Sequence, residues 1–265
     1  MKLQVYADRV SSPSRAVLLF CKLNGIDFEE KTIELSKGEH LSPEYAGKQT
    51  ISGIEEIRLI RQFHLYLCFL SHYFQLGFVA AINPMKQVPA IVVDDEFKLN
   101  ESQAIIKFLV EAFPQVADHW YPKELFKRAQ INSILAWYHT NLRRGTLNFV
   151  IHSTFAPVFG LPLDPEAAAE DEKVLSGSLA HIESFWLKGD GPFLLGSSQP
   201  SIADLGLACE IMELEVVDDG ARERILSPHQ KILKWIDATK NATQPYFDEF
   251  HALLPQVKQT LQNKI

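Results

Sequence analysis

The segment of residues 83–108 constrains the fold of this chain more than any other stretch. Residues 90–93 form an apolar run rich in β-branched side chains, two aspartates follow, and residues 97–99 alternate between apolar and charged. Together these features predict a β-hairpin. Apolar residues at helical spacing come next, with Ser102 at the expected N-cap position and Pro114 as the stop. The free backbone N–H groups of this helix would then lie above the strand ends, where they suit a carboxylate.

The start of the chain predicts a strand, a helix and a second strand. Residues 2–6 alternate as in a strand, and residues 28–35 have the composition of another. Between them, Ser11 or Ser12 can cap a helix whose first turn contains Pro13. This unit, followed by the hairpin and its helix, has the element order of a thioredoxin-like α/β domain.

The second half of the chain has a different pattern. From Trp120 onward strand signals disappear and long helical patterns replace them, so residues 111–123 are the expected linker. A length of 265 residues with 46% hydrophobic residues is enough for two domains. We therefore predict a thioredoxin-like domain over residues 1–115 and an all-α domain over residues 121–265.

Composition excludes several functions. The chain carries 26 basic and 33 acidic residues, a net charge of −7, which argues against nucleic acid as a partner. Its three cysteines are widely spaced with no CxxC pair, which fits a reducing compartment and excludes a cysteine-based zinc site. The first residues contain no uninterrupted apolar signal region. We expect a cytoplasmic protein with no metal and no membrane partner.

Five motifs, in order, resemble the theta class of glutathione transferases and most closely its plant members. The resemblance covers nearly the whole chain and implies the glutathione transferase fold, a thioredoxin-like N-terminal domain followed by an all-α domain. The motifs are Ser11-Ser12-Pro13-Ser14 followed by Arg15-Ala16-Val17, His40-Leu41, Val88-Pro89 with Glu101-Ser102, Trp137 to Arg144, and Phe193 to Gly196 followed by Ser201 to Leu205.

The resemblance implies that Ser11 is catalytic and donates a hydrogen bond to the sulfur of glutathione. A thiol of pKa ~8.5 is only slightly ionised at neutral pH, whereas the thiolate is the nucleophile. Lowering that pKa by ~2 requires ~2.7 kcal/mol of preferential stabilisation of the anion, which a hydroxyl donor and a helix N-terminus can supply. The alternative is that Ser11 and Ser12 only cap the helix.

The resemblance also implies the residues that bind glutathione. In the family, the proline of the Val-Pro pair is cis and its neighbour pairs with the tripeptide backbone, the Glu-Ser pair holds the γ-glutamyl end, and the His-Leu pair contacts the glycine end. An arginine of the helical domain reaches towards the sulfur. The alternatives are a solvated loop histidine and a solvated helix end. The implied glutathione-binding residues are Ser12, His40, Leu41, Gln87, Val88, Glu101 and Ser102, with Arg143 as the substrate or thiolate contact.

The expected activity is conjugation of glutathione to hydrophobic electrophiles, reduction of organic hydroperoxides, or both, since both need the same activated sulfur. Glutathione would be a co-substrate, with no cofactor, and the chain a homodimer. The alternative is a non-catalytic carrier of hydrophobic ligands, or an impaired splice variant with the same fold. The terminal residues Asn263-Lys264-Ile265 resemble a peroxisomal signal, so a peroxisomal pool is also expected.

One segment departs from the family. Residues 47–80, 34 in number, separate motifs that lie close together in the family. They could be a retained intron, a membrane-seeking helix or a functional lid. Polar residues inside the apolar half argue against a membrane span, which needs ~20 apolar residues. The intron is favoured because Gly47-Lys48 and Ala80-Ala81 can be encoded with splice signals, and because removing the segment restores the family spacing. We therefore predict that the segment is not part of the organised domain.

Overall fold

The computed structural model describes residues 1–46 and 82–262. The inserted segment 47–80 lies outside the described residues, so its expected character stays a prediction. The C-terminal tripeptide 263–265 also lies outside them.

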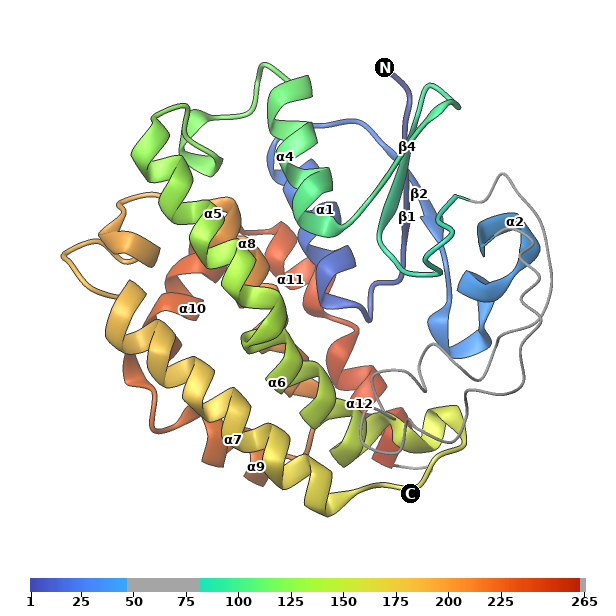
Figure 1. Cartoon of the computed structure of the whole chain (residues 1–265), viewed down its shortest axis with the longest axis vertical. Coiled ribbons are helices and arrows are strands. Elements are labelled where there is room, and N and C mark those ends of the chain that lie inside the picture. The colour runs from blue at the N-terminus through green and yellow to red at the C-terminus, as the bar shows by residue number, and fades with distance from the viewer. Residues whose placement is uncertain (47–81, 263–265) are drawn as a thin grey trace, which may run out of the picture.

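A four-stranded mixed sheet forms the first part of the molecule (Figure 1). Its strand order is β2-β1-β3-β4, with β1 parallel to β2, and the β1–β3 and β3–β4 pairs antiparallel. The predicted hairpin is confirmed. The strands are β1 Leu3–Ala7, β2 Glu29–Thr32, β3 Ala90–Val93 and β4 Phe97–Asn100.

The second strand is shorter than the predicted 28–35. Its last ladder bond joins Ile33 N–H to the carbonyl of Ala7. Beyond it, the backbone N–H of Leu35 donates to Asp8 Oδ2 at 2.9 Å, which draws the chain out of the sheet and into a short 3₁₀ turn. The side chain of Asp8 therefore ends the strand.

Helices α1, Ser12–Leu23, and α4, Ser102–Ala112, lie together on one side of the sheet, between it and the helical domain (Figure 1). On the other side lie the 3₁₀ turns η1 Leu35–Lys37 and η2 Glu39–Leu41 and the short helix α2 Pro43–Ala46. Every second residue of β1 is buried, which matches a sheet with one face on the core.

The predicted N-cap of α4 is wrong by one residue. Glu101 is the N-cap, with φ of 68°, and Ser102 is the first helical residue. The helix ends at Ala112, before the predicted stop at Pro114. The turn at Glu101 carries the chain out of β4 within a single residue, which leaves Ser102 no room to act as the cap.

The helical domain packs around one buried helix, α8, which contacts α1, α5, α6 and α10. Its helices are α5 Leu125–Thr140, α6 Leu142–Val150, α7 Pro165–His181, α8 Ile202–Ile211, α9 Asp219–Leu226, α10 Gln230–Ala242, α11 Tyr246–His251 and α12 Leu254–Gln262. Short turns of other helix types are η3 Asp118–Trp120, η4 Ile151–Phe155, η5 Ala156–Phe159, η6 Ile182–Trp186, η7 Leu194–Gly196 and η8 Met212–Val216. None of the helices in the described residues is long and apolar enough to cross a membrane.

The motif from Trp137 to Arg144 spans two helices. Asn141, with φ of −123° and ψ of −86°, separates α5 from α6. Arg143 therefore lies in the first turn of α6 rather than at a solvated helix end.

The helix α8 begins with a capping box. The hydroxyl of Ser201 accepts from Ala203 N–H, while Asp204 Oδ2 accepts from Ser201 N–H at 2.8 Å. Asp204 Oδ1 also accepts from the indole N–H of Trp235, at 2.8 Å. Trp186 and Trp235 are both buried. All four strands described lie before residue 101, and the boundaries 1–115 and 121–265 stay a prediction.

Candidate functional site

A cavity of about 880 Å³ lies between the sheet domain and the helical domain. All nine residues predicted for the site line it, although they come from segments far apart in the sequence. They are Ser11, Ser12, His40, Leu41, Gln87, Val88, Glu101, Ser102 and Arg143. The structure therefore brings the predicted residues together around one space.

Ser11 is the N-cap residue of α1, but its side chain makes no capping hydrogen bond. The alternative that Ser11 only caps the helix is thus not what the structure shows. Its backbone N–H donates to the carbonyl of Asp8 at 3.0 Å, which fixes the turn that carries it. Ser11 lines the cavity, and a hydroxyl at a helix N-terminus that the helix does not use can donate to an anion there.

Ser12 differs sharply from its neighbour. Its side chain is 2% exposed, and its hydroxyl donates to Glu210 Oε2 at 2.7 Å. Of the two serines, only Ser11 keeps its hydroxyl for a ligand.

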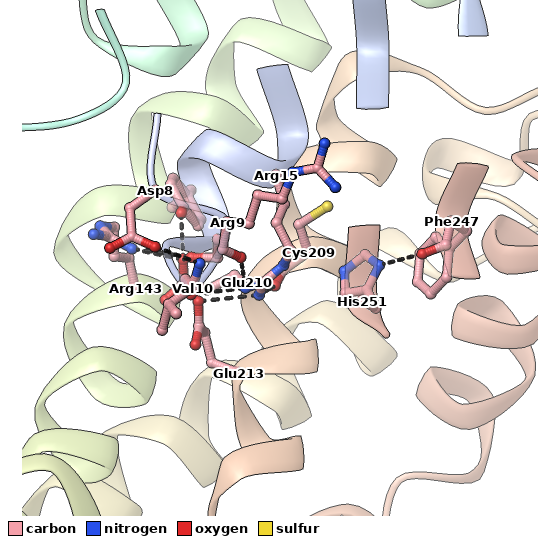
Figure 2. A network of polar contacts seen from close by, with 12 residues as sticks. Asp8, Arg9, Val10, Arg15, Arg143, Cys209, Glu210, Glu213, Phe247 and His251 are labelled. Carbon is pink, nitrogen blue, oxygen red and sulfur yellow. Dashed lines mark hydrogen bonds and ion pairs between the residues drawn. The ribbon is translucent and has the colours of Figure 1, made fainter. Parts of the chain in front are cut away.

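Behind the serines lies a buried polar network that joins the two domains (Figure 2). Glu210 Oε2 also accepts from the hydroxyl of Tyr138 at 2.5 Å and from Arg143 Nη1 at 2.9 Å. Burial, and then the neighbouring Glu210 carboxylate, raise the pKa of Tyr138 well above its ordinary value. Burial alone would lower the pKa of Arg143, but Glu210 and Tyr138 outweigh it and raise that pKa. Both groups therefore stay protonated at neutral pH.

The Val88–Pro89 peptide is cis, as the resemblance implied. Hydrogen bonds to the carbonyl of the preceding residue, Gln87, come from the Tyr45 hydroxyl at 2.5 Å and from Asn83 Nδ2 at 2.8 Å. These bonds hold the segment at the cavity wall, where the backbone of Val88 can meet an extended ligand.

Two pairs of cavity residues differ in charge. Glu101 and Ser102 open α4, whose first N–H groups have no side-chain cap. His40 and Lys86 also line the cavity, close enough for the charge of Lys86 to act on the imidazole. Burial, and then the charge of Lys86, lower the pKa of His40, so the imidazole is neutral at pH 7. The His40 side chain is half-buried rather than solvated, with Nδ1 buried and unpaired among the described residues.

Sequence reasoning missed Lys86 and the apolar wall of the cavity. Lys86 lies within the segment 83–108. The family motif in that segment is the Val88-Pro89 pair and does not include Lys86. The apolar wall comes from α6 and the turns after it, and from α12. Its residues are Leu147, Val150, Ile151, Phe155, Val158, Phe159, Leu253, Val257 and Leu261. Their only shared sequence property is apolarity, which core residues have too, so no motif could have marked them.

The arrangement matches known proteins. The family model described as "Glutathione S-transferase, N-terminal domain" matches residues 10–112. Glutathione S-transferase T1 of Arabidopsis thaliana is 50% identical over 264 residues, covering 100% of this chain and 94% of that protein. Glutathione S-transferase T2 of the same plant is 48% identical over the whole chain, which spans 39% of that longer protein.

A solved structure of a glutathione transferase also has the same fold as this chain. The human theta-class glutathione transferase, in complex with the glutathione conjugate of 1-menaphthyl sulfate, superposes with a TM-score of 0.77 at 26% identity, covering 100% of this chain and 91% of that one. With half of its residues identical to a plant relative of matching length, this chain belongs to the glutathione S-transferase family, in its theta class and among the plant members.

Proposed function

We propose that this transferase binds glutathione in the cavity between the domains and uses Ser11 to stabilise the glutathione thiolate. The proposal rests on two observations about Ser11, its unused hydroxyl and its place in the cavity wall. Its hydroxyl makes no capping bond, whereas that of Ser12 donates to Glu210, and Ser11 lines the cavity with all the other predicted residues.

The charges of the cavity fit the tripeptide. The γ-glutamyl carboxylate would accept from the free N–H groups at the start of α4, with the Glu101 carboxylate facing the ammonium group. The cysteinyl backbone would pair with Val88. The glycine carboxylate would meet His40 and Lys86, with the sulfur near Ser11.

The apolar wall supports a hydrophobic second substrate. In conjugation, the thiolate forms a bond to an electrophilic carbon and the leaving group departs with the bonding electrons. In hydroperoxide reduction, the thiolate attacks the outer oxygen and releases an alcohol, and a second glutathione converts the resulting sulfenic acid into a disulfide and water. Both reactions begin from the same thiolate, with no other cofactor. That common first step is what the proposal assigns to Ser11.

Two experiments test the proposal. Retention on immobilised glutathione distinguishes the transferase from a carrier. A carrier would bind apolar dyes but would not be retained on the glutathione column. The Ser11→Ala variant should lose most of its turnover while keeping most of its affinity for glutathione. Ser12→Ala is the matched control, because its hydroxyl is committed to Glu210. Loss of turnover in Ser12→Ala, with Ser11→Ala unaffected, would show that Ser11 is not the sulfur ligand. The homodimer and the cytoplasmic or peroxisomal location stay predictions.

A further inference from the structure

Glu210 is a carboxylate buried at the junction of the two domains, with a side-chain exposure of 0%. A single oxygen, Oε2, accepts three hydrogen bonds: from Ser12 at 2.7 Å, Tyr138 at 2.5 Å and Arg143 at 2.9 Å. These donors belong to α1, α5 and α6, so one atom connects three helices. The other oxygen, Oε1, is buried and has no partner among the described residues.

Arg143 is the member of this group that reaches the cavity. Its Nη1 bonds both Glu210 Oε2 and, at 3.2 Å, the hydroxyl of Ser12, the residue directly after Ser11. Its side chain is 24% exposed and lines the same cavity as Ser11. A guanidinium has five N–H donors in a rigid plane. Fixing one corner of that plane therefore fixes the direction in which the others point.

We propose that Glu210 is a positioning residue of the transferase site, which holds the guanidinium of Arg143 beside the sulfur of bound glutathione and partly neutralises its charge. The proposal rests on the function proposed above. Glu210 does not line the cavity, so it acts only through Arg143 and Ser12. Two effects follow from one carboxylate, a geometric one and an electrostatic one, and they can be separated.

The geometric and electrostatic effects can be separated because Glu210 Oε2 accepts three hydrogen bonds and Oε1 accepts none from the described residues. In Glu210→Gln, the amide oxygen can take the place of Oε2 and keep all three hydrogen bonds. The amide nitrogen then occupies the place of Oε1, which accepts no bond from the described residues. The variant therefore removes the negative charge and keeps the geometry, whereas Glu210→Leu removes both.

Other charged and titratable groups surround Glu210 and act on the same thiolate. His139, close to both Glu210 and Arg143, has its pKa lowered, chiefly by burial. Arg15 pairs with Glu213 at 3.0 Å on the side of α1. These groups, together with Tyr138 and the buried thiol of Cys209 on α8, are unchanged in both Glu210 variants. A difference between the variants thus reports on Glu210 itself.

The test is the pKa of the glutathione thiol in the binary complex, measured from the ultraviolet absorbance of the thiolate across a pH series on the full chain. Glu210→Gln leaves the charge of Arg143 less compensated, and a more positive surrounding favours the thiolate. We expect the thiol pKa to fall by about one, a roughly tenfold higher ratio of thiolate to thiol below both pKa values. Glu210→Leu, with Arg143 released, should raise the thiol pKa and lower kcat more than it changes KM for glutathione.

Two further variants make the test specific. Glu215→Gln is the matched control, because Glu215, on the turn η8 directly after α8, pairs with Arg222 of α9 and does not line the cavity. It should leave the thiol pKa unchanged. In an Arg143→Gln background, Glu210→Gln should no longer shift the thiol pKa, since coupled residues show non-additive effects.

The outcomes are distinct. A Glu210→Gln variant that melts at a lower temperature but shows the wild-type thiol pKa would overturn the proposal and leave Glu210 a purely structural residue. A full shift that persists without Arg143 would overturn it as well. If instead Ser11→Ala keeps full turnover, the proposed function has failed, whatever the Glu210 variants show. Should Glu210→Leu fail to fold, Glu210→Gln and its double variant still decide the question.

Discussion

The guanidinium of Arg15 lies 3.0 Å from the carboxylate of Glu213, and neither the sheet domain nor the helical domain buries this pair alone (Figure 2). Arg15 belongs to α1 and is fully buried, while Glu213 belongs to the turn after α8. The other terminal nitrogen of Arg15, Nη1, donates to the carbonyls of Arg9 at 3.0 Å and Val10 at 2.7 Å. The same side chain therefore joins the domains and fixes the loop directly before Ser11.

Arg15→Met should destabilise the protein severely. The substitution leaves Glu213 buried without its partner and frees two loop carbonyls, and breaking a buried ion pair costs about 3–5 kcal/mol. The measurement is the free energy of unfolding in urea. Arg224→Met is the control, because Arg224 forms a comparable pair with Glu172 at the surface. Exposed pairs contribute about 0–1 kcal/mol. Similar small losses in both variants would contradict the role assigned to Arg15.

His251 should make the stability depend on pH. Burial, and then the charge of Arg15, lower its pKa from 6.5 to about 3 in the folded protein. Between these values the unfolded chain binds a proton at this residue and the folded chain does not, so stability falls as the pH falls from about 6.5 towards 3. One such proton contributes a slope of about 1.4 kcal/mol per pH unit.

The His251→Gln variant removes that titration. Its free energy of unfolding, measured at several pH values between 4 and 7 (roughly the window of the shift), should vary less steeply with pH than that of the wild type. His119→Gln is the comparison, since the His119 side chain is only half-buried and bonds the carbonyl of Pro200. An unchanged slope in His251→Gln would mean that another group causes the acid sensitivity.

Lys86→Met should weaken glutathione binding through the glycine end. Lys86 lines the cavity beside His40, and a half-exposed ion pair contributes about 1 kcal/mol, roughly a fivefold change in Kd. Calorimetric titration with glutathione measures the loss. The glycine ethyl ester of glutathione, which lacks that carboxylate, should bind wild type and variant alike. Lys37→Met, on the exposed turn η1, is the control and should bind both ligands as the wild type does. An equal loss for the ester would place Lys86 elsewhere on the ligand.

The order of strands and helices could be predicted because the hydrophobic period changes clearly along the chain, and the hairpin 90–100 followed from local turn chemistry. Ser11 and Ser12 could not be told apart in the same way. Both are common capping residues, and what separates them is the acceptor Glu210, 198 positions from Ser12. Local patterns carry no information on which distant carboxylate will be buried beside a helix start. For the same reason, the break at Asn141, which places Arg143 in the site, was not visible in a continuous apolar pattern.

The two flanks of the inserted segment meet in the structure. The backbone N–H of Asn83 donates to the carbonyl of Tyr45 at 3.1 Å, although residues 47–81 intervene in sequence. Tyr45 is 2% exposed and its hydroxyl bonds the carbonyl of Gln87, while Asn83 is 1% exposed and bonds Asn100. Asn83 thus lines the cavity, Tyr45 holds the lining residue Gln87, and the two flanks are bonded directly to each other.

Deletion of residues 47–80 should therefore give a more stable and more active protein. In the shortened chain Tyr45-Ala46-Ala81-Ile82-Asn83, Asn83 follows Tyr45 by four positions, which is the spacing of the α-helical hydrogen bond that the two already make. The join would place this bond in a continuation of α2, and it would remove an apolar stretch that promotes aggregation wherever it is left exposed. We expect higher solubility, a higher melting temperature and tighter retention on immobilised glutathione than for the full chain. A deletion variant that unfolds or loses retention would show that the segment is a native element of this transferase rather than an insertion its fold can do without.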